Sequence, residues 1–220
     1  MLVALTSFVG AVIGALLGVV AKKLISGIDS RQHASQAKLV VGGLLVGVVL
    51  ALLVVARFSA WDQRAAYAAL SAGLVVQTMI DAFTHRLVRS ITHAMALSGT
   101  IFLGLNGVRT NASEALVSAT ICAVVGWTMF LVVNRISPGG VGSGDVRLVP
   151  VLGWYLGFLG YNEAFYALFI ASATAGVVGV ALIVATRGSL KRRLAFGPYL
   201  AFGTLIAVFA GEVFPTVFVT

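Results

Sequence analysis

Charged residues are scarce in this sequence of 220 residues, since Asp, Glu, Lys and Arg together make up only 10% of it. In soluble globular domains roughly a quarter of the residues are charged, so this composition excludes an ordinary soluble domain. Cysteine is scarcer still, and the single Cys122 lies inside an apolar run. One cysteine allows neither a disulfide framework within the chain nor a four-cysteine metal site. Only seven residues are acidic, so a carboxylate that falls within an apolar run requires a functional explanation.

Hydrophobic residues are abundant instead, at 60% of the chain, and the mean hydropathy is +1.04. They fall into apolar runs that approach the roughly 20 residues a helix needs to cross a bilayer. We therefore predict an all-α, polytopic membrane helical bundle of about eight transmembrane spans, with residues 1–220 forming a single domain. The predicted spans are Leu2–Ala21, Leu39–Ala56, Ala65–Ile80, Ile91–Gly107, Ala115–Val133, Val146–Gly160, Ala164–Thr186 and Leu194–Val219.

The basic residues are distributed unevenly between the two sides that eight spans would create. Of the 15 Lys and Arg residues, only Arg57, Arg64 and Arg109 fall in even-numbered loops, which leaves 12 in or beside the odd-numbered ones. The positive-inside rule then places the odd loops in the cytoplasm and both termini outside, in a cytoplasmic (inner) membrane. The basic residues form short clusters without interleaved aromatic residues, so membrane topology explains the net charge of +8 better than nucleic-acid binding does.

Asp81 and Asp145 both lie at the cytoplasmic end of a predicted span. Counting from the outer end of each span, at about 1.5 Å per residue, places both carboxylates at nearly the same depth, so we predict that they meet. Two carboxyl groups in a partly dry site share one proton over a wide pH range, which lets one act as base and the other as acid. An ion-coupling site of a small ion-coupled membrane transporter is the alternative that spacing alone leaves open.

Asp145 ends the sequence Gly142-Ser143-Gly144-Asp145, in which the glycines predict a loop that presents the aspartate at a helix start. This G-x-G-D motif resembles the active-site motif of the type IV prepilin peptidases, which are membrane aspartic proteases. Two further stretches agree with that family. Residues 81–92 resemble its first catalytic segment, and residues 196–203 resemble its F-G-P-x-L-x-x-G motif. The resemblance covers about residues 65–205.

The resemblance implies a prepilin leader peptidase, an aspartic endopeptidase with Asp81 and Asp145 as catalytic residues and with no cofactor or metal ion. Its substrates would be class III signal peptides of pilin, pseudopilin or archaellin-like precursors. These would be cut at the cytoplasmic membrane face, in the service of a type IV pilus or a protein secretion system. Many relatives carry a cysteine tetrad that is linked to N-methylation, whereas this chain has one cysteine, so we expect a short form with peptidase activity only.

The sequence departs from the family pattern at Val88 and Arg89, where Pro-Asn is common, and at Arg147, where lysine is common. A role for Arg147 in holding a substrate carbonyl and a role as an anchor at the headgroups both stay open. His85, four residues after Asp81, would tune the dyad or lie exposed in a loop.

Gly197 and Pro198 are expected to break the last span and line the active-site cavity. Three other acidic residues, Asp29, Asp62 and Glu163, are expected to lie in loops, where their amide variants should keep activity. A presenilin-like intramembrane protease is a second alternative, because that class shares G-x-G-D, but its proline-alanine-leucine segment is missing here.

Overall fold

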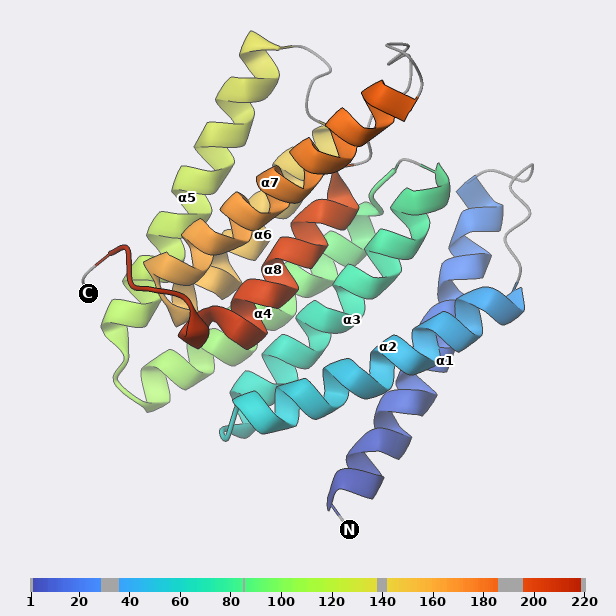
Figure 1. Cartoon of the computed structure of the whole chain (residues 1–220). Helices are drawn as coiled ribbons and strands as arrows, with labels where there is room; N and C mark the ends of the chain where they lie inside the picture. The colour runs from blue at the N-terminus through green and yellow to red at the C-terminus, as the bar shows by residue number, and fades with distance from the viewer. Residues whose placement is uncertain (1, 29–35, 85, 138–141, 186–195, 219–220) are drawn as a thin grey trace. The chain divides into compact units, whose positions relative to one another are not determined.

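The computed structural model describes residues 2–28, 36–84, 86–137, 142–185 and 196–218, and these are almost entirely helical (Figure 1). Within these ranges eight α-helices follow one another, and no strand occurs, so the prediction of an all-α bundle is confirmed. Their bounds are α1 Leu2–Ile28, α2 Gln36–Arg57, α3 Trp61–Thr84, α4 Arg89–Arg109, α5 Ser113–Ile136, α6 Ser143–Leu159, α7 Tyr161–Ala185 and α8 Gly197–Ala210. A short 3-10 helix, η1, covers Gly211–Val213.

Six of the described helices are long and apolar enough to cross a membrane, namely α1 to α5 and α7. The other two are shorter, with 17 residues in α6 and 14 in α8. At a rise of 1.5 Å per residue these span about 26 Å and 21 Å, less than the hydrocarbon core of roughly 30 Å. The chain is a multi-pass membrane protein, and its described residues form six long helices and two short ones in place of eight similar spans.

Several helices extend past the apolar runs that predicted them, because main-chain hydrogen bonding continues through polar residues. Lys22 and Lys23 lie within α1 rather than in the loop after it. The break expected at residues 161–163 is reduced to Gly160, since α7 begins at Tyr161. Gly160 has φ = +156°, a conformation that glycine adopts far more readily than other residues.

The last predicted span is also corrected by the structure. Helix α8 begins at Gly197, and Pro198 stands in its first turn, where a missing N–H removes no helical hydrogen bond. Pro198 therefore stands at the start of a described helix, which agrees with a break in the chain at this point. The part of this predicted span before Phe196 lies outside the described residues.

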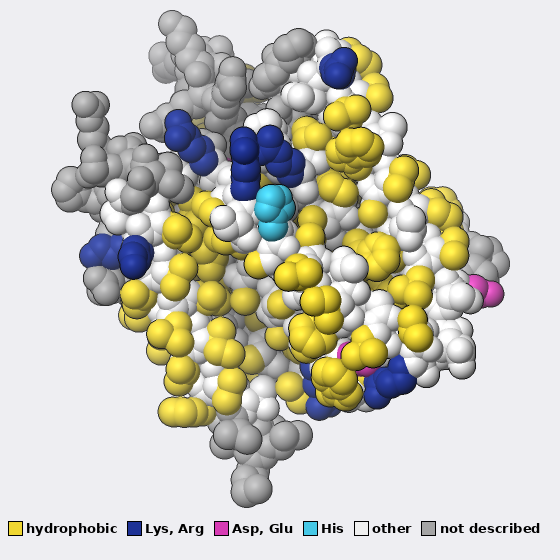
Figure 2. All heavy atoms as spheres, turned by 180° about the vertical axis from the view of Figure 1, so that it is seen from behind, with side chains coloured by type: hydrophobic (Ala, Val, Ile, Leu, Met, Phe, Trp, Pro, Cys, Tyr) yellow, Lys and Arg dark blue, Asp and Glu magenta, His cyan; other side chains and the backbone are white. Residues whose placement is uncertain are grey.

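The outer faces of the long helices carry large apolar side chains, as membrane-spanning helices require. Examples from different helices are Leu16, Leu45, Leu97, Val124 and Phe169, all of them exposed. Figure 2 shows such hydrophobic side chains over much of the visible surface of the described residues. In a soluble protein so much exposed apolar surface would cause aggregation, whereas lipid tails cover it at no cost.

The chain divides into two compact units, Met1–Val117 and Ser118–Thr220. In the first unit α1 and α2 pack closely through glycines, since a side chain at Gly14 would collide with the carbonyl group of Gly43. Small residues at a helix crossing allow this close approach of two backbones. Helix α3 contacts α1, α2 and α4, and its last two turns pack in an apolar cluster formed by Ala21 and Ile25 of α1 with Val76 and Ile80 of α3.

In the second unit the short α6 is the most enclosed element, with eleven of its 17 residues buried. Gly157 brings it against α5, because a Cβ atom there would stand 2.7 Å from the main-chain oxygen of Ser118. The Ser118 hydroxyl donates a 2.6 Å hydrogen bond to the Gly157 carbonyl at this contact. Helix α8 packs on α7 in a similar way, where Gly203 faces the carbonyl oxygen of Ala167.

Candidate active site

Asp81 lies in the last turn of α3, which ends at Thr84, and its side chain is buried with only 5% of the residue exposed. Val76 and Ile80, in the turns before it, belong to an apolar cluster with Ala21 and Ile25 of α1. At the C-terminal end of a helix the carbonyl groups point outward, so this position disfavours a negative charge.

Asp145 occupies the opposite kind of position, because it is the third residue of α6. It is buried as well, with 6% of the residue exposed. The free N–H groups and the dipole of a helix N-terminus favour a negative charge at this point. The prediction that Asp145 stands at a helix start is confirmed, but Gly144, expected in the loop before it, is part of the helix, and residues 138–141 of that loop lie outside the described residues.

Gly142 is the N-cap residue of α6, and its carbonyl accepts the hydrogen bond of the Val146 N–H at 3.2 Å. The Asp145 carboxyl group folds back toward this residue. A Cβ atom at position 142 would lie 2.9 Å from Oδ2 of Asp145, closer than real Cβ atoms come to an oxygen. The missing side chain at Gly142 is therefore a condition for the carboxyl conformation. Gly144, the second residue of α6, is half-buried.

Each unit thus supplies one of the two predicted catalytic aspartates, Asp81 in the first and Asp145 in the second. Their pairing stays a prediction, as do the roles of Gly142, Gly144, Arg147, Gly197 and Pro198. Arg147 is exposed in the first turns of α6, and Gly197 is buried at the start of α8. His85 lies outside the described residues.

A polar network beside Asp81 was missed by the sequence analysis. Gln77, one turn before Asp81 on α3, is 1% exposed and contacts the first turn of α4. Its Oε1 accepts a 2.8 Å hydrogen bond from the Val88 N–H, and its Nε2 donates to the Val88 carbonyl at 3.1 Å and to Oγ1 of Thr92 at 2.9 Å. The only sequence signal was an amide side chain inside an apolar run.

Asp62 corrects another expectation, because it lies in the first turn of α3 and is fully buried rather than exposed in a loop. Its carboxylate accepts hydrogen bonds from Arg109 at 2.7 Å and from Nδ2 of Asn106 at 2.8 Å, both on α4. Glu163 is likewise part of a helix, the first turn of α7, while Asp29 lies outside the described residues. Asp62 is thus a structural ion-pair residue that joins α3 to α4.

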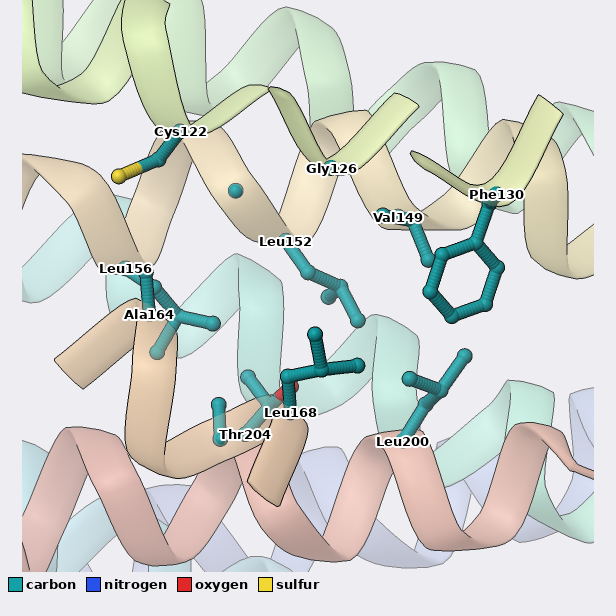
Figure 3. Close-up of a pocket in the computed structure, with 12 residues that line it drawn as sticks. Cys122, Gly126, Phe130, Val149, Leu152, Leu156, Ala164, Leu168, Leu200 and Thr204 are labelled. Carbon is teal, nitrogen blue, oxygen red and sulfur yellow. The ribbon is translucent and has the colours of Figure 1, made fainter. Parts of the chain in front are cut away.

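An apolar pocket of about 70 Å³ lies within the second unit, between α5, α6, α7 and α8 (Figure 3). Leu152, Leu168 and Leu200 point into it from three different helices, and Cys122 stands at its edge. None of its described lining residues is charged, so it offers no acid or base. In the part of the chain that the structure describes, no three His, Cys, Asp or Glu side chains gather as metal ligands would.

Comparison with known proteins places these features in a family. The sequence profile of the type IV leader peptidase family matches residues 68–180, which are 113 of the 220 residues and include both Asp81 and Asp145. The chain therefore belongs to the type IV leader peptidase family. No solved structure matches it.

Three curated relatives illustrate the similarity, and each is named prepilin leader peptidase/N-methyltransferase. The protein of Aeromonas salmonicida (strain A449) is 26% identical over 82% of this chain and 61% of its own length. That of Aeromonas hydrophila is 27% identical over 63% of this chain and 47% of its own length. That of Burkholderia pseudomallei (strain 1026b) is 30% identical over 66% of this chain and 46% of its own length. The chain spans about half to three fifths of these relatives.

Proposed function

We propose that this protein is a prepilin leader peptidase, a membrane aspartic endopeptidase that removes the leader peptides of type IV pilin-like precursors. The observation that carries the proposal is that the family match includes two buried carboxylates, Asp81 and Asp145, at a helix C-terminus and a helix N-terminus respectively. Burial favours one proton shared between the two groups. A helix N-terminus favours a negative charge, so Asp145 is the base, and a helix C-terminus disfavours one, so Asp81 is the acid.

The proposed reaction is the hydrolysis of one peptide bond. Asp145 takes a proton from a water molecule, whose oxygen attacks the scissile carbonyl carbon, and Asp81 gives its proton to the carbonyl oxygen. Collapse of the tetrahedral intermediate breaks the C–N bond, and the leaving nitrogen takes up a proton from the dyad. One water is consumed, and both carboxyl groups return to their starting states after proton exchange.

We further propose that the chain lies in the cytoplasmic (inner) membrane with both termini outside and the aspartates toward the cytoplasm. The excess of Lys and Arg in the odd-numbered connections supports this orientation. A precursor whose leader remains in the cytoplasm would then present its cleavage site, after a glycine, at the membrane face. Pilin, pseudopilin and archaellin-like precursors are the proposed substrate class.

The test is cleavage of candidate precursors by membranes that contain the full chain, with the cut position read by mass spectrometry. A single cut at the cytoplasmic border of the precursor's apolar segment is expected. A cut within that apolar segment would favour a presenilin-like protease instead. Proton or ion flux in liposomes without any cleavage would favour a transporter.

The pairing of the two aspartates needs its own measurement, because each belongs to a different unit. In a Cys122→Ala background, the double variant Asp81→Cys with Asp145→Cys should form a crosslink with a short bifunctional thiol reagent. The pair Asp62→Cys with Asp145→Cys is the matched control and should not crosslink, since Asp62 lies 19 residues, or about 28 Å, from Asp81 along α3. Equal crosslinking of both pairs would contradict the proposed site.

A further inference from the structure

Gln77 has a buried carboxamide that makes three hydrogen bonds to the start of the next helix. Its oxygen accepts from the Val88 N–H, and its two N–H groups donate to the Val88 carbonyl and the Thr92 hydroxyl. Val88 is the N-cap residue of α4, and it has no side-chain oxygen with which to cap the helix. The Gln77 carboxamide, on the neighbouring helix α3, instead binds the main-chain N–H and carbonyl of Val88 itself.

These bonds also fix the path of the chain after Asp81. Helix α3 ends at Thr84, seven residues or about 10 Å beyond Gln77, yet Val88 returns to the carboxamide of Gln77. Residues 86–88 therefore bring the chain back toward the α3 turn of Gln77, one turn before Asp81. The Val88 side chain completes the attachment, since it packs against the apolar cluster of Val76 and Ile80.

Gln77 and Asp81 are four residues apart, so they share one face of α3. The carboxamide that holds Val88 therefore lies one helical turn from Asp81 on this face. Neither Gln77, Val88 nor Thr92 brings a formal charge to the site. The attachment can therefore orient an acid without fixing its ionisation state, as a cation would.

We propose that Gln77 is a positioning residue for catalysis: its hydrogen bonds to Val88 hold the α3–α4 connection so that the Asp81 carboxyl group keeps its reactive orientation. This inference rests on the proposed peptidase function and adds to it a residue that never touches the substrate. A misplacement of about 1 Å in a catalytic group costs on the order of a hundredfold in rate. The role should therefore appear in kcat, while substrate binding and KM stay nearly unchanged.

The experiment compares two amide-to-apolar variants of similar shape on the same helix pair. Gln77→Met removes the attachment beside Asp81. Asn106→Leu removes a buried amide that joins α4 to Asp62 at the other end of α3. Both variants are expected to lower the unfolding temperature of the full chain in detergent. Only Gln77→Met should lower kcat, by about tenfold to a hundredfold, with KM within about threefold of wild type.

A second readout follows the connection itself, by hydrogen–deuterium exchange of the peptide that contains Val88 and Thr92. Exchange there should become faster in Gln77→Met and stay unchanged in Asn106→Leu, because only the first variant frees the Val88 N–H. Wild-type kcat in Gln77→Met, unchanged exchange at Val88, or an equal loss of kcat in both variants would overturn the inference.

A conservative variant, Gln77→Glu, tests whether a loss of activity in Gln77→Met comes from the lost hydrogen bonds or from a folding defect. In Gln77→Glu the introduced carboxyl group keeps one donor and one acceptor toward Val88 while it is protonated, but it has only acceptors once it is ionised. The kcat of Gln77→Glu relative to wild type should therefore be near unity at low pH and fall as pH rises. A ratio that stays at unity at every pH would also overturn the inference.

Failure of the proposed function would look different. If the wild type cleaves no precursor, or if Asp81→Asn cleaves as fast as wild type, the peptidase assignment fails. The exchange measurement then still decides whether Gln77 holds the connection. If the wild type cleaves and Asp81→Asn does not, the peptidase assignment stands. The kcat and hydrogen exchange of the Gln77 variants then decide whether Gln77 has the positioning role.

Discussion

Helix α3 carries a buried aspartate at each end, and the two ends are built differently. Asp62 in the first turn is held by the Arg109 guanidinium and the Asn106 amide, and it also accepts the N–H of Gln63 at 2.8 Å. Around Asp81 in the last turn, the attachment between α3 and α4 consists of the neutral groups of Gln77, Val88 and Thr92. Both ends are buried, and at the Asp62 end the bond to α4 is made by a cation.

The bond between Asp62 and Arg109 fits a structural role for the Asp62 carboxylate, because it joins α3 to α4. A cation within hydrogen-bond distance favours the ionised form of a carboxylate, and the resulting ion pair can join two helices. An acid in a protease dyad has to gain and lose a proton in every cycle, so a neutral attachment nearby serves it better. Burial alone does not distinguish the two aspartates.

The largest expected effect comes from removing the proposed catalytic carboxyl groups. Asp81→Asn and Asp145→Asn should each lower precursor cleavage by at least about a thousandfold, because the loss of either group removes the shared proton chemistry. Protein abundance in the membrane should stay near wild type, as measured by immunoblot. Asp62→Asn is the control on the same helix and should keep kcat per folded molecule within about threefold. Full activity of Asp81→Asn would contradict a catalytic role for Asp81 and its contrast with Asp62.

A smaller effect is expected when the geometry of Asp145 is disturbed and its chemistry is kept. Gly142→Ala introduces a Cβ atom 2.9 Å from Oδ2 of Asp145, so the carboxyl group has to move. Cleavage should fall about tenfold to a hundredfold, with normal expression. Ser143→Ala, the next residue and exposed, should change kcat by less than about twofold. Equal activity of the two variants would show that the carboxyl position seen here is not the reactive one.

Substitutions in the ion pair of Asp62 and Arg109 should lower the stability of the protein and leave its activity unchanged. The loss of unfolding free energy should depend on which of the two residues is replaced. Arg109→Met leaves a fully buried carboxylate without its cation and should cost about 2 kcal/mol of unfolding free energy. Asp62→Asn leaves a half-exposed guanidinium that water can solvate, so its cost should be about 1 kcal/mol. Thermal unfolding in detergent measures both. A larger loss in Asp62→Asn than in Arg109→Met would mean that the buried charge is not the costly element.

The sequence predicted these features unequally, for physical reasons. Hydropathy located all eight helices, because an apolar run of sufficient length has to be helical in a membrane, and the glycines before Asp145 located a helix start. Hydropathy did not distinguish the two short helices from the six long ones. The ends of these helices are set by packing, which hydropathy does not describe. Neither attachment of α3 to α4 was visible, because Asp62 meets Arg109 47 residues later. Such contacts depend on the register of two helices, which hydropathy does not encode.

The smallest effect, with no change in activity, is expected from thiol labels that report the side of the membrane on which each end of α3 lies. Ser59, just before α3, and Ser90, at the start of α4, are both exposed in the structure. If the positive-inside interpretation holds, the Asp62 end faces outward and the Asp81 end faces the cytoplasm. In a Cys122→Ala background, Ser59→Cys should react with an impermeant maleimide applied to intact cells, and Ser90→Cys should react only after permeabilisation. The reverse pattern would place the aspartates on the outer side and remove a cytoplasmic leader as the substrate. Labelling of both positions in intact cells would mean that α3 does not cross the membrane at all.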